Sequence, residues 1–234
     1  FKEIFLKANE ENYTNIITNG TLLNDDFFDL FISENNFKVL SISIDTIGNV
    51  NRDFKKGQWE KLVENLKSFK KKIIEKKRDI VINIKTVITD ENIKELFQLN
   101  QIITDDIQAD THDLMLLKGA EIQHADFLFD YKDAFKEYEA YEYKNFEKLI
   151  DQLNLIREKN VKSNTKAFLH PNIIPLNSKD EIKLDKYRFL NEQKHNPKNF
   201  KTCLSPWTSV HVNVDGNVFP CMAFSIGNVK KQKK

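Results

Sequence analysis

Two cysteines, Cys203 and Cys221, are the only thiols in this chain of 234 residues. The residues between them have the pattern of a β-hairpin. Valines alternate with polar residues over 210–214, which is the period of a half-buried strand. Asp215-Gly216 suits a tight turn, because glycine adopts positive φ without steric cost, and Pro220 ends the returning strand because it has no N–H donor. We therefore expect both cysteines at the open end of one hairpin, close in space.

Two neighbouring thiols are compatible with three kinds of chemistry. They can form a disulfide, remain as buried thiols, or supply two thiolate ligands to a metal centre. A disulfide needs an oxidising compartment, and no stretch of the sequence resembles a secretory signal. A metal centre needs more ligands than two cysteines supply. The residues alone leave all three interpretations open.

The same stretch resembles the opening of a SPASM domain, the cluster-binding extension of many radical S-adenosylmethionine enzymes. The shared pattern is a cysteine, a spacer of this length, a glycine, four residues and a second cysteine. Trp207, the Val-x-Pro-Cys end at 218–221 and the Ile-Gly-Asn-Val run at 226–229 are also similar to that domain. The resemblance implies that Cys203 and Cys221 bind an auxiliary iron–sulfur cluster of the 4Fe-4S type.

Composition argues against several classes of function. Lys and Arg number 36 and Asp and Glu number 35, so the net charge of +1 gives no electrostatic signature of nucleic-acid binding. No apolar run approaches the ~20 residues that a membrane span needs. Low cysteine usage and the lack of a recognisable signal indicate a cytoplasmic protein. Apolar residues make up 40% of the chain, which is enough for a hydrophobic core.

Strand-like and helix-like segments alternate along most of the chain. Short β-branched runs predict strands, and apolar residues at helical spacing predict helices. The alternation is the pattern of βα units on a parallel sheet with right-handed connections, whose strands end at one shared edge. The first strand is expected to be buried. Strands are predicted at 14–18, 37–45, 79–87, 113–117 and 166–169. Helices are predicted at 1–12, at 27–32 after an N-cap at 24–26, at 59–77, at 93–102 after a cap at 89–92, and at 143–159.

This series resembles the middle and end of the partial barrel in radical S-adenosylmethionine (radical SAM) enzymes. Residues 17–23, 40–45 and 87–93 are similar to the ends of that family's third, fourth and fifth strands. The resemblance implies an α/β fold: a partial (β/α)6 TIM-like barrel of the radical SAM type, truncated at its N-terminus and followed by the start of a SPASM-like extension with a β-hairpin. The implied domains are the partial barrel with strands 3 to 6 at 1–165, a connecting segment at 166–200 and the start of the SPASM-like domain at 201–234.

The resemblance also implies a binding site for S-adenosyl-L-methionine at the strand ends. Hydroxyl, amide and carboxylate groups suit its ribose and sulfonium, an arginine suits its carboxylate, and apolar side chains suit its adenine. Simpler explanations also exist: an Asn-Gly turn, a loop carboxylate or helix cap, and a surface ion pair. The implied site residues are Thr18, Asn19, Ser43, Asp45, Arg52, Val87 and Ile88.

Two motifs of the family do not occur in this sequence. One is the C-x-x-x-C-x-x-C loop, which holds the 4Fe-4S cluster that cleaves S-adenosylmethionine, and the other is the glycine-rich second-strand motif. We expect an internal fragment, with both motifs before Phe1 and the later SPASM cysteines after Lys234. The alternative is a degenerate homologue without clusters. The histidines show no paired metal spacing, so each is expected to be solvated or hydrogen-bonded: His112, His124, His170, His195 and His211.

The full-length parent is expected to be a radical SAM enzyme that generates a 5′-deoxyadenosyl radical for hydrogen abstraction, while the fragment alone is expected to be inactive. Its implied partners are a peptide, protein or small-molecule substrate and an electron donor such as flavodoxin or ferredoxin, with no nucleic acid and no membrane. One alternative is a cluster-free barrel that acts as a peptide or partner binding module. Another is a plain α/β domain whose hairpin binds zinc or nothing.

Overall fold

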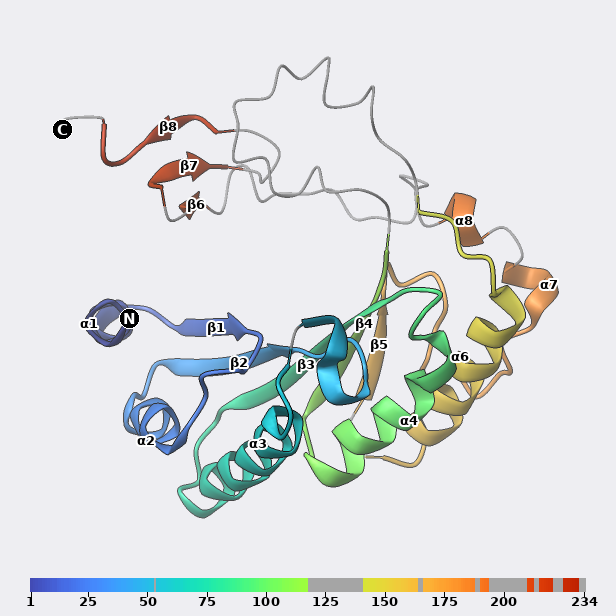
Figure 1. Cartoon of the computed structure of the whole chain (residues 1–234), viewed down its shortest axis with the longest axis horizontal. Coiled ribbons are helices and arrows are strands. Elements are labelled where there is room, and N and C mark those ends of the chain that lie inside the picture. The colour runs from blue at the N-terminus through green and yellow to red at the C-terminus, as the bar shows by residue number, and fades with distance from the viewer. Residues whose placement is uncertain are drawn as a thin grey trace. The chain divides into compact units, whose positions relative to one another are not determined.

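The computed structural model describes residues 1–52, 54–117, 141–163, 166–187, 190–193, 210–212, 215–220 and 225–231. The chain divides into two compact units. The first comprises Phe1–Leu117 and Tyr143–Leu190, and the second comprises Lys118–Glu142 and Asn191–Lys234. The first unit contains a five-stranded sheet with its helices, and the second contains a small three-stranded sheet (Figure 1).

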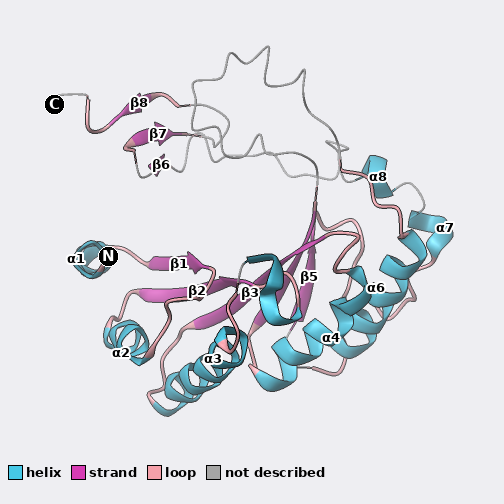
Figure 2. Cartoon of the chain, viewed as in Figure 1, coloured by secondary structure: helices cyan, strands magenta, loops and turns pink. Residues whose placement is uncertain are grey.

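Five parallel strands form the sheet of the first unit, in the order β1-β2-β3-β4-β5. A helix connects each strand to the next, and α2, α3, α4 and α6 lie on the same face of the sheet (Figure 1 and Figure 2). The strands are β1 (Thr14–Thr18), β2 (Phe37–Ser43), β3 (Val81–Ile88), β4 (Thr111–Leu116) and β5 (Lys166–His170). The connecting helices are α2 (Asp25–Ser33), α3 (Gln58–Glu75), α4 (Leu96–Gln101) and α6 (Phe146–Asn160).

This arrangement confirms the predicted α/β class and the parallel sheet. A doubly wound sheet would have helices on both faces. Sequential strand order with these helices on one face is instead the connectivity of a (β/α) barrel, whose helices form an outer layer. The barrel itself stays a prediction, because the described strands form a single five-stranded sheet.

The hydrophobic core lies between the sheet and these helices. Strand residues of one parity, among them Ile42, Ile82 and Ile84, have no exposed surface. Phe28 of α2 stacks on Phe69 of α3 with 4.4 Å between the ring centroids. Such a pair adds about 1 kcal/mol to the stabilisation that its buried area provides. The core therefore fixes which face of each strand points toward the helices.

Two predictions about local structure were wrong. β1 is not buried: Ile17 is 67% exposed, because β1 is an edge strand among the described residues and pairs with β2 alone. The single helix predicted after the cap at 89–92 is broken into a 3-10 turn, η2 (Ile93–Glu95), then α4, then a π-helical turn, η3 (Ile102–Asp106). The side chain of Asn92 forms no cap, since it donates to the carbonyl oxygens of Asp45 and Val87, both at 2.8 Å. The remaining helices of the described chain are α1 (Lys2–Glu11), η1 (Ile47–Arg52), α7 (Leu184–Tyr187) and α8 (Leu190–Gln193).

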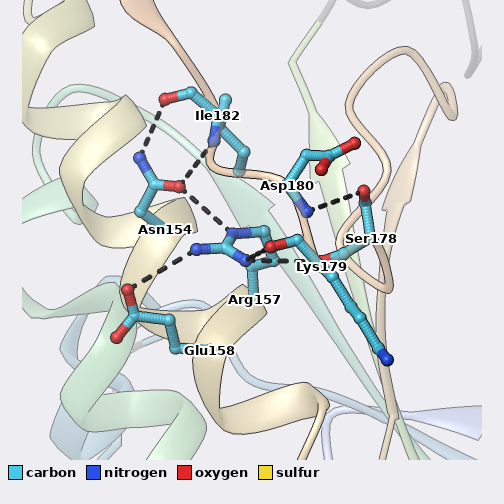
Figure 3. A network of polar contacts seen from close by, with 7 residues as sticks. All are labelled: Asn154, Arg157, Glu158, Ser178, Lys179, Asp180 and Ile182. Carbon is cyan, nitrogen blue, oxygen red and sulfur yellow. Dashed lines mark hydrogen bonds and ion pairs between the residues drawn. The ribbon is translucent and has the colours of Figure 1, made fainter.

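Helix α6 holds the segment that follows β5. Arg157 is 6% exposed and donates through Nη1 to the carbonyl oxygens of Ser178 and Lys179, at 3.3 and 3.0 Å. Asn154 donates to the carbonyl oxygen of Ile182 at 2.9 Å and accepts from its N–H at 2.8 Å. Figure 3 shows both side chains extending from the helix to this segment. Backbone groups of an irregular segment thus find their hydrogen-bond partners on a helix.

The second unit contains an antiparallel sheet of three short strands, β6 (His211–Val212), β7 (Asn217–Phe219) and β8 (Gly227–Asn228). β6 and β7 confirm the predicted hairpin. Their pairs, His211 with Phe219 and Val212 with Val218, centre on Asp215. A two-residue turn at Asp215-Gly216 would shift this register by one residue, so the predicted turn was wrong.

The third strand explains the turn. Asn228 donates through Nδ2 to the carbonyl oxygen of Asp215 at 3.0 Å, and the N–H of Val229 donates to the carbonyl oxygen of Gly216 at 2.8 Å. Gly216 has φ of +86°, and an added Cβ would lie 3.0 Å from Cγ of Lys230. Contacts from β8 and its flank therefore hold Asp215 and Gly216 in place. Residues 215 and 216 alone do not reveal these contacts, because the partners lie more than ten residues further along the chain.

Among the helices of the described stretches, none combines the length and the apolar character that crossing a bilayer requires.

Candidate functional site

The carboxyl ends of β1, β2 and β3 meet at one edge of the sheet, as parallel strands require. Thr18 pairs with Ile42, and Ser43 pairs with Lys85. Asp45 follows β2, and its Oδ1 accepts a hydrogen bond from the N–H of Val87 in β3 at 2.8 Å. Two of the predicted site residues, Asp45 and Val87, are therefore in direct contact.

Asp45 is held firmly at this edge. It is 6% exposed, its N–H donates to Oδ1 of Asn49 at 3.3 Å, and its carbonyl oxygen accepts from Nδ2 of Asn92 at 2.8 Å. Asn49 is fully buried, has φ of +49° and also donates to the carbonyl oxygen of Ser43 at 3.4 Å. Sequence analysis missed Asn49 and expected Asn92 to take part in a helix cap. The available signal was that asparagine in a loop directly after a strand often bonds to nearby backbone.

Around Asn19 the simpler explanation accounts for the local structure. Oδ1 of Asn19 accepts from the N–H of Thr21 at 3.1 Å and from its hydroxyl at 2.8 Å, and Oγ1 of Thr18 accepts from the N–H of Gly20 at 3.1 Å. Gly20 has φ of +81°, and an added Cβ would lie 2.8 Å from Cδ1 of Leu62 in α3. The Asn-Gly pair therefore forms a turn that packs on a helix. Ligand binding by Thr18 and Asn19 stays a prediction.

The remaining predicted residues at this edge differ in their surroundings. Val87 is half-buried, whereas the side chain of Ile88 is fully buried in the core. The carbonyl oxygen of Ile88 accepts from the hydroxyl of Tyr143 at 2.7 Å, and that hydroxyl accepts from the N–H of Leu117 at 2.8 Å. Tyr143 thus joins the ends of β3 and β4, which sequence analysis did not foresee. The side chain of Arg52 lies outside the described residues.

The second face of the sheet, opposite the core, is rich in polar side chains. Successive strand residues point to opposite faces, so the residues between the core positions project here. Strand register arranges them in layers across the sheet: one layer runs through Ser41, Asn83, Thr111 and Lys166, and the next through Ser43, Lys85, Asp113 and Phe168. We call this surface the polar face and define it by Ser41, Ser43, Asn83, Lys85, Thr111, Asp113, Met115, Lys166, Phe168 and His170.

A series of polar contacts crosses the polar face from β2 to β5. The hydroxyl of Ser41 donates to Oδ1 of Asn83 at 3.1 Å, and Nδ2 of Asn83 donates to Oγ1 of Thr111 at 2.6 Å and to Oδ2 of Asp113 at 3.0 Å. Oδ1 of Asp113 lies 3.5 Å from Nε2 of His170. Ser41 and Asn83 are buried, whereas the side chains of Asp113 and His170 are 24% and 53% exposed. The accessible end of the series therefore lies on β4 and β5.

Sequence analysis did not single out Asn83 or Asp113. A sequence cue for a polar second face was present. Strands that are covered on both faces are continuous apolar runs, whereas polar residues interrupt β2 and β3 and alternate with apolar residues in β4. His170 agrees with the expectation of a solvated or hydrogen-bonded histidine.

His112 points to the core and is fully buried. Nδ2 of Asn100 lies 2.9 Å from its Nδ1, and Oγ1 of Thr86 lies 2.9 Å from its Nε2. The Asn100 amide donates to Nδ1, so Nε2 carries the proton and donates to Thr86, whose hydroxyl donates to the carbonyl oxygen of Ile44 at 2.5 Å. Burial lowers the pKa of His112 to about 3. A neutral, doubly bonded imidazole suits a structural role.

Two hollows of about 420 and 510 Å³ lie at the other edge of the sheet, among the residues of α3 and the chain before β4. Several of their charged groups are paired: Lys70 with Asp110 at 2.5 Å, Lys71 with Glu75 at 3.7 Å, and Asp105 with Lys159 of α6, whose contact lowers the pKa of Asp105. In barrel folds the amino-terminal edge serves stability and the carboxyl-terminal edge holds the site. We therefore place the candidate site at the carboxyl edge and the polar face.

Cys203 and Cys221 lie outside the described residues. Within the described stretches, no three His, Cys, Asp or Glu side chains gather as a metal site. The donor chemistry nevertheless fits an iron–sulfur cluster, because cysteine thiolates are the ligands that such clusters use and both cysteines flank the observed hairpin.

Comparison with known proteins agrees with this donor chemistry. No curated protein matches the chain. Residues 203–233 match the family model described as SPASM, an iron-sulfur cluster-binding domain.

Proposed function

We propose that this chain is part of a radical SAM enzyme that binds S-adenosyl-L-methionine and a 4Fe-4S cluster. In the full enzyme, the cluster of a C-x-x-x-C-x-x-C loop, a motif that this sequence does not contain, would cleave S-adenosyl-L-methionine with one electron from the donor and so supply a 5′-deoxyadenosyl radical for hydrogen abstraction. The observation that carries the proposal is the SPASM match over 203–233, which contains both cysteines of the chain. The parallel sheet with α2, α3, α4 and α6 on one face supports it.

In this proposal the carboxyl edge holds S-adenosyl-L-methionine. Ser43 supplies a hydroxyl group, and Arg52 pairs with the carboxylate of the methionine moiety. Asp45 acts in part as a positioning residue, since its contact with the N–H of Val87 joins β2 to β3 at 2.8 Å. Val87 offers an apolar surface to the adenine. The fully buried side chain of Ile88 restricts that residue to a backbone contact.

The hairpin stretch provides the cluster ligands. Cys203 and Cys221 supply two thiolates, and a 4Fe-4S cluster takes four ligands. The chain contains no further cysteine, so the remaining positions are filled by other residues or by another polypeptide segment. The substrate is a peptide, a protein or a small molecule, and an electron donor of the flavodoxin or ferredoxin class supplies electrons.

Metal content after anaerobic reconstitution tests the proposal. The chain is incubated with ferrous iron, sulfide and zinc in excess 2-mercaptoethanol, whose thiolates occupy open cluster positions. We expect bound iron with acid-labile sulfide in the wild type and neither in the Cys203→Ser/Cys221→Ser variant. Binding of zinc without sulfide would support the plain α/β domain instead. Absence of any metal would support the cluster-free binding module.

A further inference from the structure

The polar face places two opposite charges side by side without pairing them. Lys85 and Asp113 are register partners on β3 and β4, and neighbouring strands lie about 4.8 Å apart. Asp113 is directed to Asn83 and His170, at 3.0 and 3.5 Å. Among the described residues, Lys85 forms no ion pair and is half-buried. An anionic acceptor and a cationic donor are therefore both presented on one surface.

We propose that Asp113 and Lys85 bind a substrate group that presents an N–H donor and an oxygen acceptor on one edge. A primary amide and an amino-acid head group have this chemistry. Asp113 accepts from the nitrogen, and Lys85 donates to the oxygen. This inference rests on the proposed function, because it names the substrate group bound beside the edge that is proposed for S-adenosyl-L-methionine.

The contacts of Asn83 prepare Asp113 for this role. Asn83 is 6% exposed, and its Oδ1 accepts from Ser41 while its Nδ2 donates to Thr111 and Asp113. These contacts fix both the amide orientation and one carboxylate oxygen. A carboxylate accepts about four hydrogen bonds, so Asp113 retains capacity for a ligand. A pre-positioned acceptor loses little conformational entropy on binding.

The charged side chains around Asp113 and Lys85 favour the binding of a dipolar group over that of a simple ion. Lys85 and Lys166 project from β3 and β5, and Asp113 and His170 project from β4 and β5. A lone cation near Asp113 would be repelled by the two lysines, and a lone anion near Lys85 would be repelled by Asp113. A group with a donor and an acceptor satisfies both charges at once.

Met115 provides a specific reporter for the test. It belongs to the polar face, pairs with His170 in the register, and is 40% exposed. The chain has two methionines, so ¹³C-methyl labelling gives two signals, and Met115→Leu identifies the relevant one. The full 234-residue chain is titrated with acetamide, glycine, acetate and methylammonium. The last two probes offer an acceptor only and a donor only.

We expect acetamide or glycine to shift the Met115 signal saturably, with an affinity about tenfold higher than that of acetate or methylammonium. Preference for acetamide indicates an amide-bearing substrate, and preference for glycine indicates an amino acid. Asp113→Asn and Lys85→Leu should each weaken binding about tenfold. Lys85→Leu tests the proposal without removing a hydrogen bond of the described fold and without adding a methionine signal. Asp79→Asn removes an equal charge from a side chain that is 91% exposed and should leave the affinity unchanged.

Three results would overturn the inference. They are equal affinity for acetate or methylammonium, no saturable shift with any probe, and binding that survives both substitutions. The titration needs neither a cluster nor S-adenosyl-L-methionine. Its failure therefore leaves the proposed function standing, and failure to assemble a cluster leaves the titration result unaffected.

Discussion

His112 shows how one buried residue can join the sheet to its helices. Its ring connects Asn100 of α4 to Thr86 of β3, and Thr86 continues to the backbone of Ile44 after β2. Every polar atom in this path has a partner. A proton added to Nδ1 would remove the acceptor that Asn100 needs and would bury a charge.

Acid should therefore weaken the fold through His112. Its pKa is about 3 in the folded chain, whereas the ordinary pKa of a histidine is 6.5, so the unfolded chain takes up a proton first as the pH falls. The contribution of His112 is complete above pH 6.5 and is lost toward pH 3, at about 1 kcal/mol per pH unit. In urea unfolding, His112→Gln should have a lower free energy of unfolding than the wild type near neutral pH. This gap in free energy should shrink by about 2 kcal/mol near pH 5, because only the wild type loses the contribution of His112. A constant gap would contradict this account.

Gly20 is required both for its backbone conformation and for its lack of a side chain. Gly20→Ala should destabilise the fold by about 2 kcal/mol, because an alanine is strained at φ of +81° and its Cβ would meet Leu62 at 2.8 Å. Gly57→Ala is a matched control: φ is +82°, but nothing lies within 4 Å of the added Cβ. The control should cost about 1 kcal/mol in thermal or urea unfolding. Equal losses would show that the contact with Leu62 contributes nothing.

At the scale of elements, local patterns predicted most helices and strands. Asn24 caps α2 as expected, accepting from the N–H of Phe27 at 3.1 Å. Failures occur where a distant contact decides the local structure. The side chain of Asn92 donates to the backbone of Asp45 instead of capping the next helix, and contacts from β8 and its flank hold the backbone at Gly216. Neither contact is visible in a short window of sequence.

The anchoring of the segment after β5 to α6 gives a prediction at this scale. Arg157→Met should lower the free energy of unfolding by about 3 kcal/mol, because the carbonyl oxygens of Ser178 and Lys179 would lose a charged donor. Glu158→Gln should change it by less than about 1 kcal/mol, since that partner is 62% exposed and lies 3.5 Å from Arg157. Urea denaturation compares the two. Similar small losses would show that α6 does not anchor the segment.

For the whole molecule, the order of βα units predicted the parallel sheet and the edge where Asp45 and Val87 meet. The polar face could not be predicted in the same way. Its network depends on the register among β2, β3, β4 and β5, which sets Ser41 beside Asn83 and Asp113 beside His170. A single sequence gives the alternation of a strand but not its alignment with a neighbour.

The cluster is the central claim, and electron paramagnetic resonance of the reconstituted, dithionite-reduced chain tests it most directly. The account predicts the signal of a reduced 4Fe-4S cluster in the wild type, lost when Cys203 and Cys221 are both replaced by serine. Asp79→Asn should keep the signal. A spectrum without any cluster signal, or one that the double substitution leaves unchanged, would contradict the assignment of 203–233 as a cluster-binding segment.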